Sequence, residues 1–212
     1  HHQSGPVFDE RGCRLGTRST NMDITERKRA AEHIECLAFQ DQLTGLPNRL
    51  EIARRLQEQI DRSTAAETGP PCFAVLGFDL RRFRNINDSF GHTFGDQVIL
   101  RVATRLKAAQ PGASVLGRVD GDKFALIAPD IETDAAAEQL ASRMLEAIER
   151  PLRIDTSEIY LSCGVGYVLF PTDGETPETL LRNTDVAVTR AKNEPATRVG
   201  TYRKGMIDAV HH

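Results

Sequence analysis

The stretch RVDGDKFALI, residues Arg118–Ile127, decides the centre of the predicted fold. Its apolar, β-prone run is interrupted by Asp120, Gly121, Asp122 and Lys123. Asp-Gly is the strongest short-range signal for a β-hairpin, so the flanking segments PGASVLGRV and KFALIAP are expected to pair as antiparallel strands. The same tip would bring two carboxylates together. It is therefore a plain turn, a metal site or the altered remains of one.

Strands and helices alternate on both sides of this hairpin. Residues 72–80 before it form a nearly continuous apolar run, typical of a strand buried on both faces. Residues 81–110 are expected to form a helix that breaks near Gly91 and resumes at Gly95 and Asp96. The segments after the hairpin predict an amphipathic helix ended by Pro151, a buried strand over 159–171, a helix capped by Thr176 or Thr179 and stopped near Pro195, and a short strand over 198–203.

The resulting order is the ferredoxin-like βαββαβ pattern. It predicts an α/β fold of the α+β sandwich kind, in which an antiparallel-centred sheet carries two helices on one face. An extra N-terminal helix within residues 43–62 and C-terminal hairpin elements are expected to be added to it. This is the cyclase-like palm used in metal-dependent nucleotidyl chemistry, although a fold alone does not set function.

The composition is that of one ordinary domain with a smaller attachment. The chain has 212 residues, of which 40% are hydrophobic, and a formal net charge of −3. The lack of a basic excess argues against nucleic-acid binding, and no apolar run reaches the ~18 residues of a membrane span. The cysteines show no metal-ligand spacing, which favours free thiols in a reducing, cytoplasmic compartment; they are Cys13, Cys36, Cys72 and Cys163.

The N-terminal segments are expected to belong to something other than the main domain. Residues 1–22 contain short polar strands without a core of their own. Residues 23–40 have the charge pattern of a helix with a thin apolar stripe. Such a helix either pairs with a partner helix, as a linker that dimerises, or stands alone in solvent.

Two carboxylates are expected to meet at one edge of the sheet. Asp79 ends the first strand and Asp122 lies on the hairpin tip, and these two places are neighbours in a βαββαβ sheet. Together they could hold Mg²⁺, a hard cation that takes oxygen ligands and substrate phosphates. Taken singly, Asp79 could be a strand-end cap and Asp122 a turn residue.

The segment after Asp79 offers groups that suit a nucleotide. Backbone amides that open a helix cradle phosphates. Asn87 and Asp96 could read guanine, because a carboxylate accepts from its N1–H and N2–H while an amide takes the same base edge. By spacing alone they could equally be turn residues. Lys192 could reach a terminal phosphate or be an ordinary helix-end cation.

Several motifs together resemble one family. DQLTGLPNR, FDLRRFRNINDSFGHTFGD, RVDGDKF, and LSCGVGYVLFPTDG with LLRNTDVAVTRAK are similar to successive motifs of the GGDEF domain, the diguanylate cyclase family, over residues 41–203. The resemblance implies a cyclase-like palm that joins two GTP into cyclic di-GMP across a homodimer with Mg²⁺ or Mn²⁺. Residues 1–40 look like the tail of a PAS sensor domain with its signalling helix. Residues 204–212 resemble the start of a linker to an EAL phosphodiesterase domain.

The resemblance assigns roles to individual positions. Asp79, the Leu80 carbonyl and Asp122 match the metal ligands, and Asp79 and Asp122 are thereby the candidate catalytic residues. The positions that match nucleotide-binding residues are Phe83, Arg84, Asn87, Asp96, Gly121 and Lys192.

Other positions depart from the family pattern. The GGDEF string is DGDKF here, with Asp120 in place of a glycine and Lys123 in place of a carboxylate. Arg81 stands at the second aspartate of the family's Asp-x-Asp. At the phosphate end, Thr189 stands in place of the family's tyrosine, Pro195 in place of a glycine and Ala196 in place of an arginine. The family's inhibitory RxxD site would fall at Pro111 and Ser114, so it is absent.

Losing one transition-state-stabilising group typically lowers a rate by about 10²–10³. We therefore expect a degenerate GGDEF domain, inactive or very weak, that acts as a GTP-binding regulatory module; in some composite members of the family such a domain tunes an attached phosphodiesterase. The alternatives are an active cyclase, in which Arg81 assists at the phosphates, and a ligand-free dimerisation scaffold, in which Asp120 pairs with Lys123 and closes the pocket.

Overall fold

The computed structural model describes residues 2–8, 14–21, 38–65, 72–194 and 198–202, which divide into two compact units between residues 38 and 39. In the first unit, β1 (His2–Phe8) pairs with β2 (Arg14–Asn21) as an antiparallel hairpin. The predicted signalling helix falls mostly within residues 22–37, and the predicted EAL linker within residues 204–212. Both segments lie outside the described residues.

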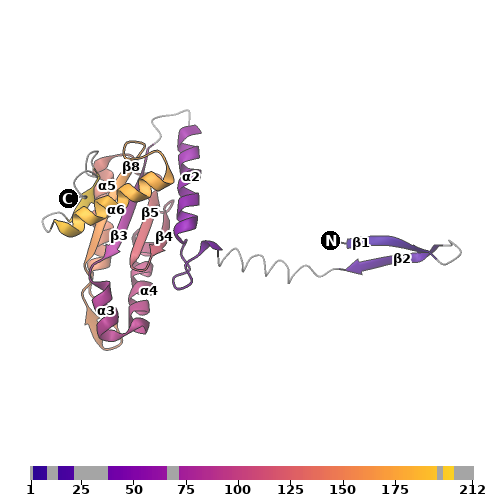
Figure 1. Ribbon diagram of the computed structural model, residues 1–212, viewed down its shortest axis with the longest axis horizontal. Helices are drawn as coiled ribbons and strands as arrows, with labels where there is room; N and C mark the ends of the chain where they lie inside the picture. The colour runs from indigo at the N-terminus through magenta and orange to yellow at the C-terminus, as the bar shows by residue number, and fades with distance from the viewer. Residues whose placement is uncertain (1, 9–13, 22–37, 66–71, 195–197, 203–212) are drawn as a thin grey trace. The chain divides into compact units, whose positions relative to one another are not determined.

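A five-stranded sheet forms the centre of the second unit, in the order β4-β5-β3-β8-β9 (Figure 1). Every residue of the central strand is buried, as the apolar run predicts. Neighbouring strands are antiparallel, except that β9 runs parallel to β8. The strands are β3 (Phe73–Leu80), β4 (Val115–Asp120), β5 (Lys123–Ala128), β8 (Cys163–Phe170) and β9 (Val199–Thr201).

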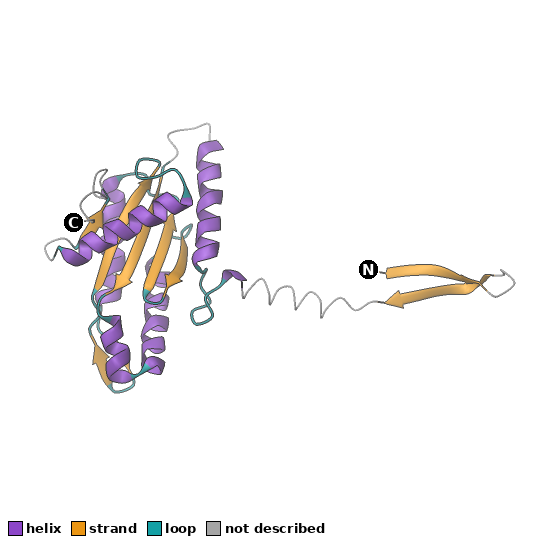
Figure 2. Ribbon diagram, in the orientation of Figure 1, coloured by secondary structure: helices purple, strands orange, loops and turns teal. Residues whose placement is uncertain are grey.

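Helices cover both faces of this sheet (Figures 1 and 2). Alternate residues of β3 face opposite sides, so one face packs on α4 and α5 and the other on α2 and α6. The two-helix face that the βαββαβ pattern predicts is confirmed for α4 and α5. The helices are α2 (Arg49–Ala65), α3 (Phe83–Phe90), α4 (His92–Ala109), α5 (Asp134–Glu149) and α6 (Pro177–Asn193).

Side-chain caps start three of these helices; at α2, Asn48 Oδ1 accepts hydrogen bonds from the Leu50 and Glu51 amides at 3.0 and 3.1 Å. The Thr176 hydroxyl accepts a hydrogen bond from the Thr179 amide at 3.2 Å, so Thr176 is the cap of α6 and Thr179 is not. The Thr133 hydroxyl accepts from the Ala136 amide in the same way and starts α5. Each cap satisfies an amide that the helix itself leaves without an acceptor.

Helix α6 lies almost directly on the sheet. A Cβ built on Gly166 would be 2.4 Å from the Val188 nitrogen, and one on Gly200 would be 2.0 Å from the Ala187 oxygen. Only glycine permits this approach of helix backbone to strand backbone. The approach carries the last turn of α6 over the start of β8, where a Cβ on Gly164 would be 2.5 Å from the Lys192 Cγ.

Two expectations about the elements are corrected, and one hairpin was not predicted. Helix α4 begins at His92 rather than at Gly95, because the single residue Gly91, at φ 86°, makes the whole break. The hairpin of β6 (Leu152–Ile154) and β7 (Ser157–Ile159) was not predicted. The expected C-terminal hairpin is instead the parallel strand β9.

No helix in the part of the chain that the structure describes is long and apolar enough to cross a bilayer.

Candidate functional site

Asp79 and Asp122 meet where β3 ends and the β4–β5 hairpin turns. In the sheet, Asp79 stands between Lys123 of β5 and Gly164 of β8. The next residue, Leu80, donates its amide hydrogen to the Asp122 carbonyl at 3.2 Å. Burial, and next the negative charge of Asp79, raise the pKa of Asp122 above its ordinary value. The two carboxyl groups thus share one partly buried place, as the sequence predicts.

The hairpin tip is a tight turn with a bulged strand. Gly121 and Asp122 form the two-residue loop, and the register shifts between Arg118 and Asp120. Neither loop residue has a positive φ, so the turn is not the primed type that Asp-Gly favours. The carboxylate of Asp120 accepts the Gly121 amide hydrogen at 2.9 Å. It therefore folds back onto its own turn.

Two lysines flank the carboxylates. The Lys192 ammonium lies 2.9 Å from Asp79 Oδ1, and the Asp79 side chain is only 12% exposed. Lys123 Nζ lies 3.7 Å from Asp185 Oδ1 on α6. Lys123 therefore pairs with Asp185 rather than with Asp120, and the ion pair on which the scaffold interpretation depended does not form.

Arg81 points from the end of β3 toward α6. One of its guanidinium nitrogens donates to the Ala191 carbonyl, while its Nε is buried and has no hydrogen-bond acceptor among the described residues. Its backbone amide donates to the Ser162 carbonyl at 2.7 Å. A cation thus replaces the carboxylate that the family pattern places here, and it is anchored on a helix.

The two predicted guanine-reading positions lie on neighbouring helices. A Cβ built on Gly95 would be 1.8 Å from Asn87 Oδ1, so the Asn87 amide lies directly over the residue that precedes Asp96. Asn87 Oδ1 is buried and finds no donor among the described residues, whereas Asp96 is exposed. A buried acceptor without a donor is costly, and a ligand N–H would remove that cost.

The remaining predicted positions surround the start of α3. Phe83 is partly buried against the core, and Arg84 is exposed. Arg82 precedes the helix at φ 55°, and no side chain caps the helix start. The first amides of α3 are thus left for an acceptor from outside the helix, which suits a phosphate.

The oxygen ligands present fit one divalent cation. Asp79, Asp122 and the Leu80 carbonyl are the kinds of ligand that Mg²⁺ or Mn²⁺ shares with phosphate oxygens. Within the described ranges, no group of three or more His, Cys, Asp or Glu side chains is arranged to hold a metal ion. Arg81 and Lys123 stand where further acidic groups would have helped to hold a second ion.

Arg118 is a positioning residue that the sequence reasoning missed. Its Nη1 donates to both carboxylate oxygens of Asp41, at 3.0 and 3.1 Å, and its Nε and Nη2 donate to the Gly121 carbonyl. Asp41 also accepts from the amide and the hydroxyl of Thr44. The turn before α2 is thereby tied to the hairpin tip. An arginine three residues before the turn was the available signal, but its partner is 77 residues away.

Comparison with known proteins gives a consistent result. Residues 38–198 match the family described as "Diguanylate cyclase, GGDEF domain". The chain is 36% identical over 170 residues to the cyclic di-GMP phosphodiesterase PdeR of Escherichia coli, a match that covers 80% of the chain and 25% of PdeR. It is 33% identical over 159 residues to the diguanylate cyclase TpbB of Pseudomonas aeruginosa, which covers 74% of the chain and 36% of TpbB.

A solved structure supports the same assignment. The GGDEF domain of PA1120 (TpbB or YfiN) from Pseudomonas aeruginosa superposes with a TM-score of 0.75 at 28% identity. The match covers 82% of the chain and 99% of that domain. The chain therefore spans a whole domain of this kind, but only about a quarter to a third of the curated relatives named above.

Proposed function

Because the chain belongs to the diguanylate cyclase GGDEF domain family, we propose that it serves cyclic di-GMP signalling as a GTP-binding regulatory domain that makes little or no cyclic di-GMP. Two kinds of feature support the proposal. The groups suited to bind the nucleotide are assembled, whereas those suited to the reaction are incomplete.

The binding groups support a bound GTP. Asn87 presents an unpaired buried acceptor beside Asp96, at the end of the site suited to guanine. The uncapped start of α3 offers amides, and Lys192 offers an ammonium near Asp79. Asp79, Asp122 and the Leu80 carbonyl would hold Mg²⁺ or Mn²⁺, which would neutralise charge on the phosphates. Metal and phosphate would have to take over the contact that Lys192 makes with Asp79.

The observation that carries the proposal is the ion pair between Lys123 and Asp185. The fourth position of the signature is Lys123, so it offers no carboxylate to the metal or to a reacting hydroxyl. Its ammonium is directed toward Asp185 on α6. Cyclisation requires each 3′-hydroxyl to lose its proton and attack the α-phosphate of the other GTP while pyrophosphate leaves. With Asp79 and Asp122 as the remaining carboxyl pair, the proton and the phosphate charge lack part of their stabilisation.

Calorimetric titration with GTP and Mg²⁺ tests the binding. We expect saturable heat, lost when Asp96→Ala removes the carboxylate that would accept from guanine. Glu146→Ala is the matched control, because it removes an exposed carboxylate from α5 and should leave the heat unchanged. No heat at millimolar GTP, or equal losses in both variants, would contradict the proposal.

The placement of the domain in a longer protein is part of the proposal. We propose that an upstream PAS-type domain in the cytoplasm signals through residues 23–40, and that the domain tunes an EAL phosphodiesterase that follows residue 212. The similarity to a much longer cyclic di-GMP phosphodiesterase supports this arrangement. Self-association through the helix of residues 23–40, or through the GGDEF domain itself, would then carry the signal.

A further inference from the structure

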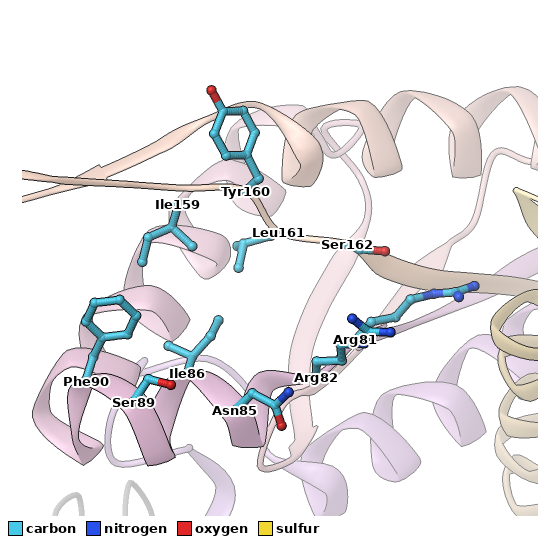
Figure 3. A pocket seen from close by; sticks show the side chains of 10 residues that line it. All are labelled: Arg81, Arg82, Asn85, Ile86, Ser89, Phe90, Ile159, Tyr160, Leu161 and Ser162. Atoms are coloured by element: carbon cyan, nitrogen blue, oxygen red, sulfur yellow. The ribbon is translucent and has the colours of Figure 1, made fainter.

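A cavity of about 520 Å³ lies between α3 and the segment that joins β7 to β8 (Figure 3). Its volume is in the usual range for a small-molecule site. The residues that line it come from these two segments and from the end of β3: Arg81, Arg82, Asn85, Ile86, Ser89, Phe90, Ile159, Tyr160, Leu161 and Ser162.

The two ends of the cavity differ in chemistry (Figure 3). Ile86, Ile159 and Leu161 face one another, with Phe90 beside them. Arg82 and Ser162 lie at the opposite end, with the Asn85 amide nearby. No acidic residue is among those that line the cavity. The Tyr160 hydroxyl points away from it and interacts with Glu158.

Arg82 is the cation available to a ligand. Its side chain makes no ion pair or hydrogen bond with any described residue, and it is exposed, whereas Arg81 is anchored on α6. Its backbone is held at φ 55°, a region uncommon for residues other than glycine. A strained, unpaired arginine at the mouth of a cavity is a feature that a ligand would explain.

The cavity adjoins the proposed nucleotide site at Arg81 and at the start of α3, but it lies on another face of α3. Arg82, Ile86, Ser89 and Phe90 follow the spacing of one helix face, whereas Asn87 packs on Gly95. None of the metal or guanine positions lines the cavity. The helix α3 thus stands between two different surfaces.

We propose that this cavity is a second ligand site, which binds a small organic anion with a planar apolar body. The apolar body lies between Ile86 and Leu161, beside Phe90. The anionic group accepts hydrogen bonds from the Arg82 guanidinium and from the Asn85 side-chain amide or the Ser162 hydroxyl. The proposal does not depend on GTP binding.

The probe for this site is 8-anilinonaphthalene-1-sulfonate, which combines fused aromatic rings with a sulfonate. We expect its fluorescence to titrate with one dye per chain in the folded protein. Arg82→Gly removes the guanidinium and tolerates the left-handed backbone, so the affinity should fall by about tenfold or more. Phe90→Ser should have a similar effect; because Phe90, although 54% exposed, also stacks on Phe94 with the ring centroids 4.8 Å apart, circular dichroism must first show that this variant is folded.

Matched controls separate this site from general dye binding. Arg101→Ala removes another exposed arginine, and Leu50→Ser another exposed apolar side chain, 59% exposed; both should leave the affinity within about twofold. Dye binding should persist in Asp96→Ala and under excess GTP with Mg²⁺. Absence of a saturable signal, equal losses in the controls, or displacement of the dye by GTP would overturn the proposal.

Discussion

Gly95 sets the position of the Asn87 side chain. With a Cβ at this position, Asn87 Oδ1 would be 1.8 Å away, so the amide would have to move. We predict that Gly95→Ala weakens GTP binding by about tenfold or more, because the amide leaves the guanine edge. Calorimetry of the folded variant measures this effect.

Gly112→Ala is the control for this substitution, because a Cβ at Gly112 meets nothing within 4 Å. It should bind GTP as the unaltered chain does. If Gly95→Ala also bound GTP with unchanged affinity, Asn87 would have no role in reading the base.

The two described cysteines should differ in reactivity. Burial raises the pKa of the Cys163 thiol to about 12, so at pH 8 its thiolate fraction is about 10⁻⁴. Cys72 is partly exposed, although burial also raises its pKa. We predict that iodoacetamide labels Cys72 well before Cys163 in the folded protein, as peptide mass spectrometry would show. Equal labelling rates would contradict the burial of Cys163 at the start of β8.

At the scale of single residues, the positions of the site carboxylates were predictable from the sequence, whereas the pairing of residues far apart in the sequence was not. Asp79 and Asp122 could be placed because one ends an apolar run and the other lies in a turn. The ion pairs of Lys192 with Asp79 and of Lys123 with Asp185 join residues far apart in sequence, and no periodicity indicates them. The same holds for Arg81 and the Ala191 carbonyl.

The turn before α2 is held to the hairpin by a carboxylate whose charge matters for stability. Burial alone would raise the pKa of Asp41, but hydrogen bonds from Thr44 and Arg118 outweigh it and lower the pKa below 3.8. A lowered pKa in the folded state means stabilisation that is present above pH 3.8 and is lost as the pH falls through the folded-state value.

We therefore predict that Asp41→Asn lowers the free energy of unfolding at pH 7, by about 1–3 kcal/mol. The difference from the unaltered chain should shrink as the pH falls below 3.8. Urea unfolding between pH 3 and pH 7 tests this pH dependence. Stability curves that remain parallel down to pH 3 would show that the ionised carboxylate does not stabilise the fold.

The order of the elements was predictable because most of them carry their own signals. The continuous apolar run indicated β3, Pro151 marked the end of α5, and a threonine cap marked the start of α6. The hairpin of β6 and β7 was missed because its strands have three residues each and its turn uses Asp155 at φ 51° rather than glycine. The parallel pairing of β9 depends on how α6 returns to the sheet, which no local pattern shows.

For the whole domain, the proposal attributes weak catalysis to a few altered positions. We predict that the combined change Arg81→Asp, Asp120→Gly and Lys123→Glu raises cyclic di-GMP formation by about 10² or more, because each restored group stabilises charge in the transition state. Chromatography of reactions with GTP and Mg²⁺ measures the product.

Full activity is not expected from this variant, since Pro195 and Ala196 remain; both lie outside the described residues. Asp130→Gly, which changes an exposed aspartate elsewhere, is the control and should form no product. If the restored variant bound GTP and still made nothing, the altered hairpin tip would not be the cause of inactivity.

The most direct test of the central claim uses a single sample of the unaltered chain. GTP with Mg²⁺ is titrated into it in a calorimeter, and the contents are then separated by chromatography. The account predicts saturable binding and GTP recovered intact, without cyclic di-GMP. Cyclic di-GMP in amounts that grow with time would contradict it and identify the domain as an active cyclase.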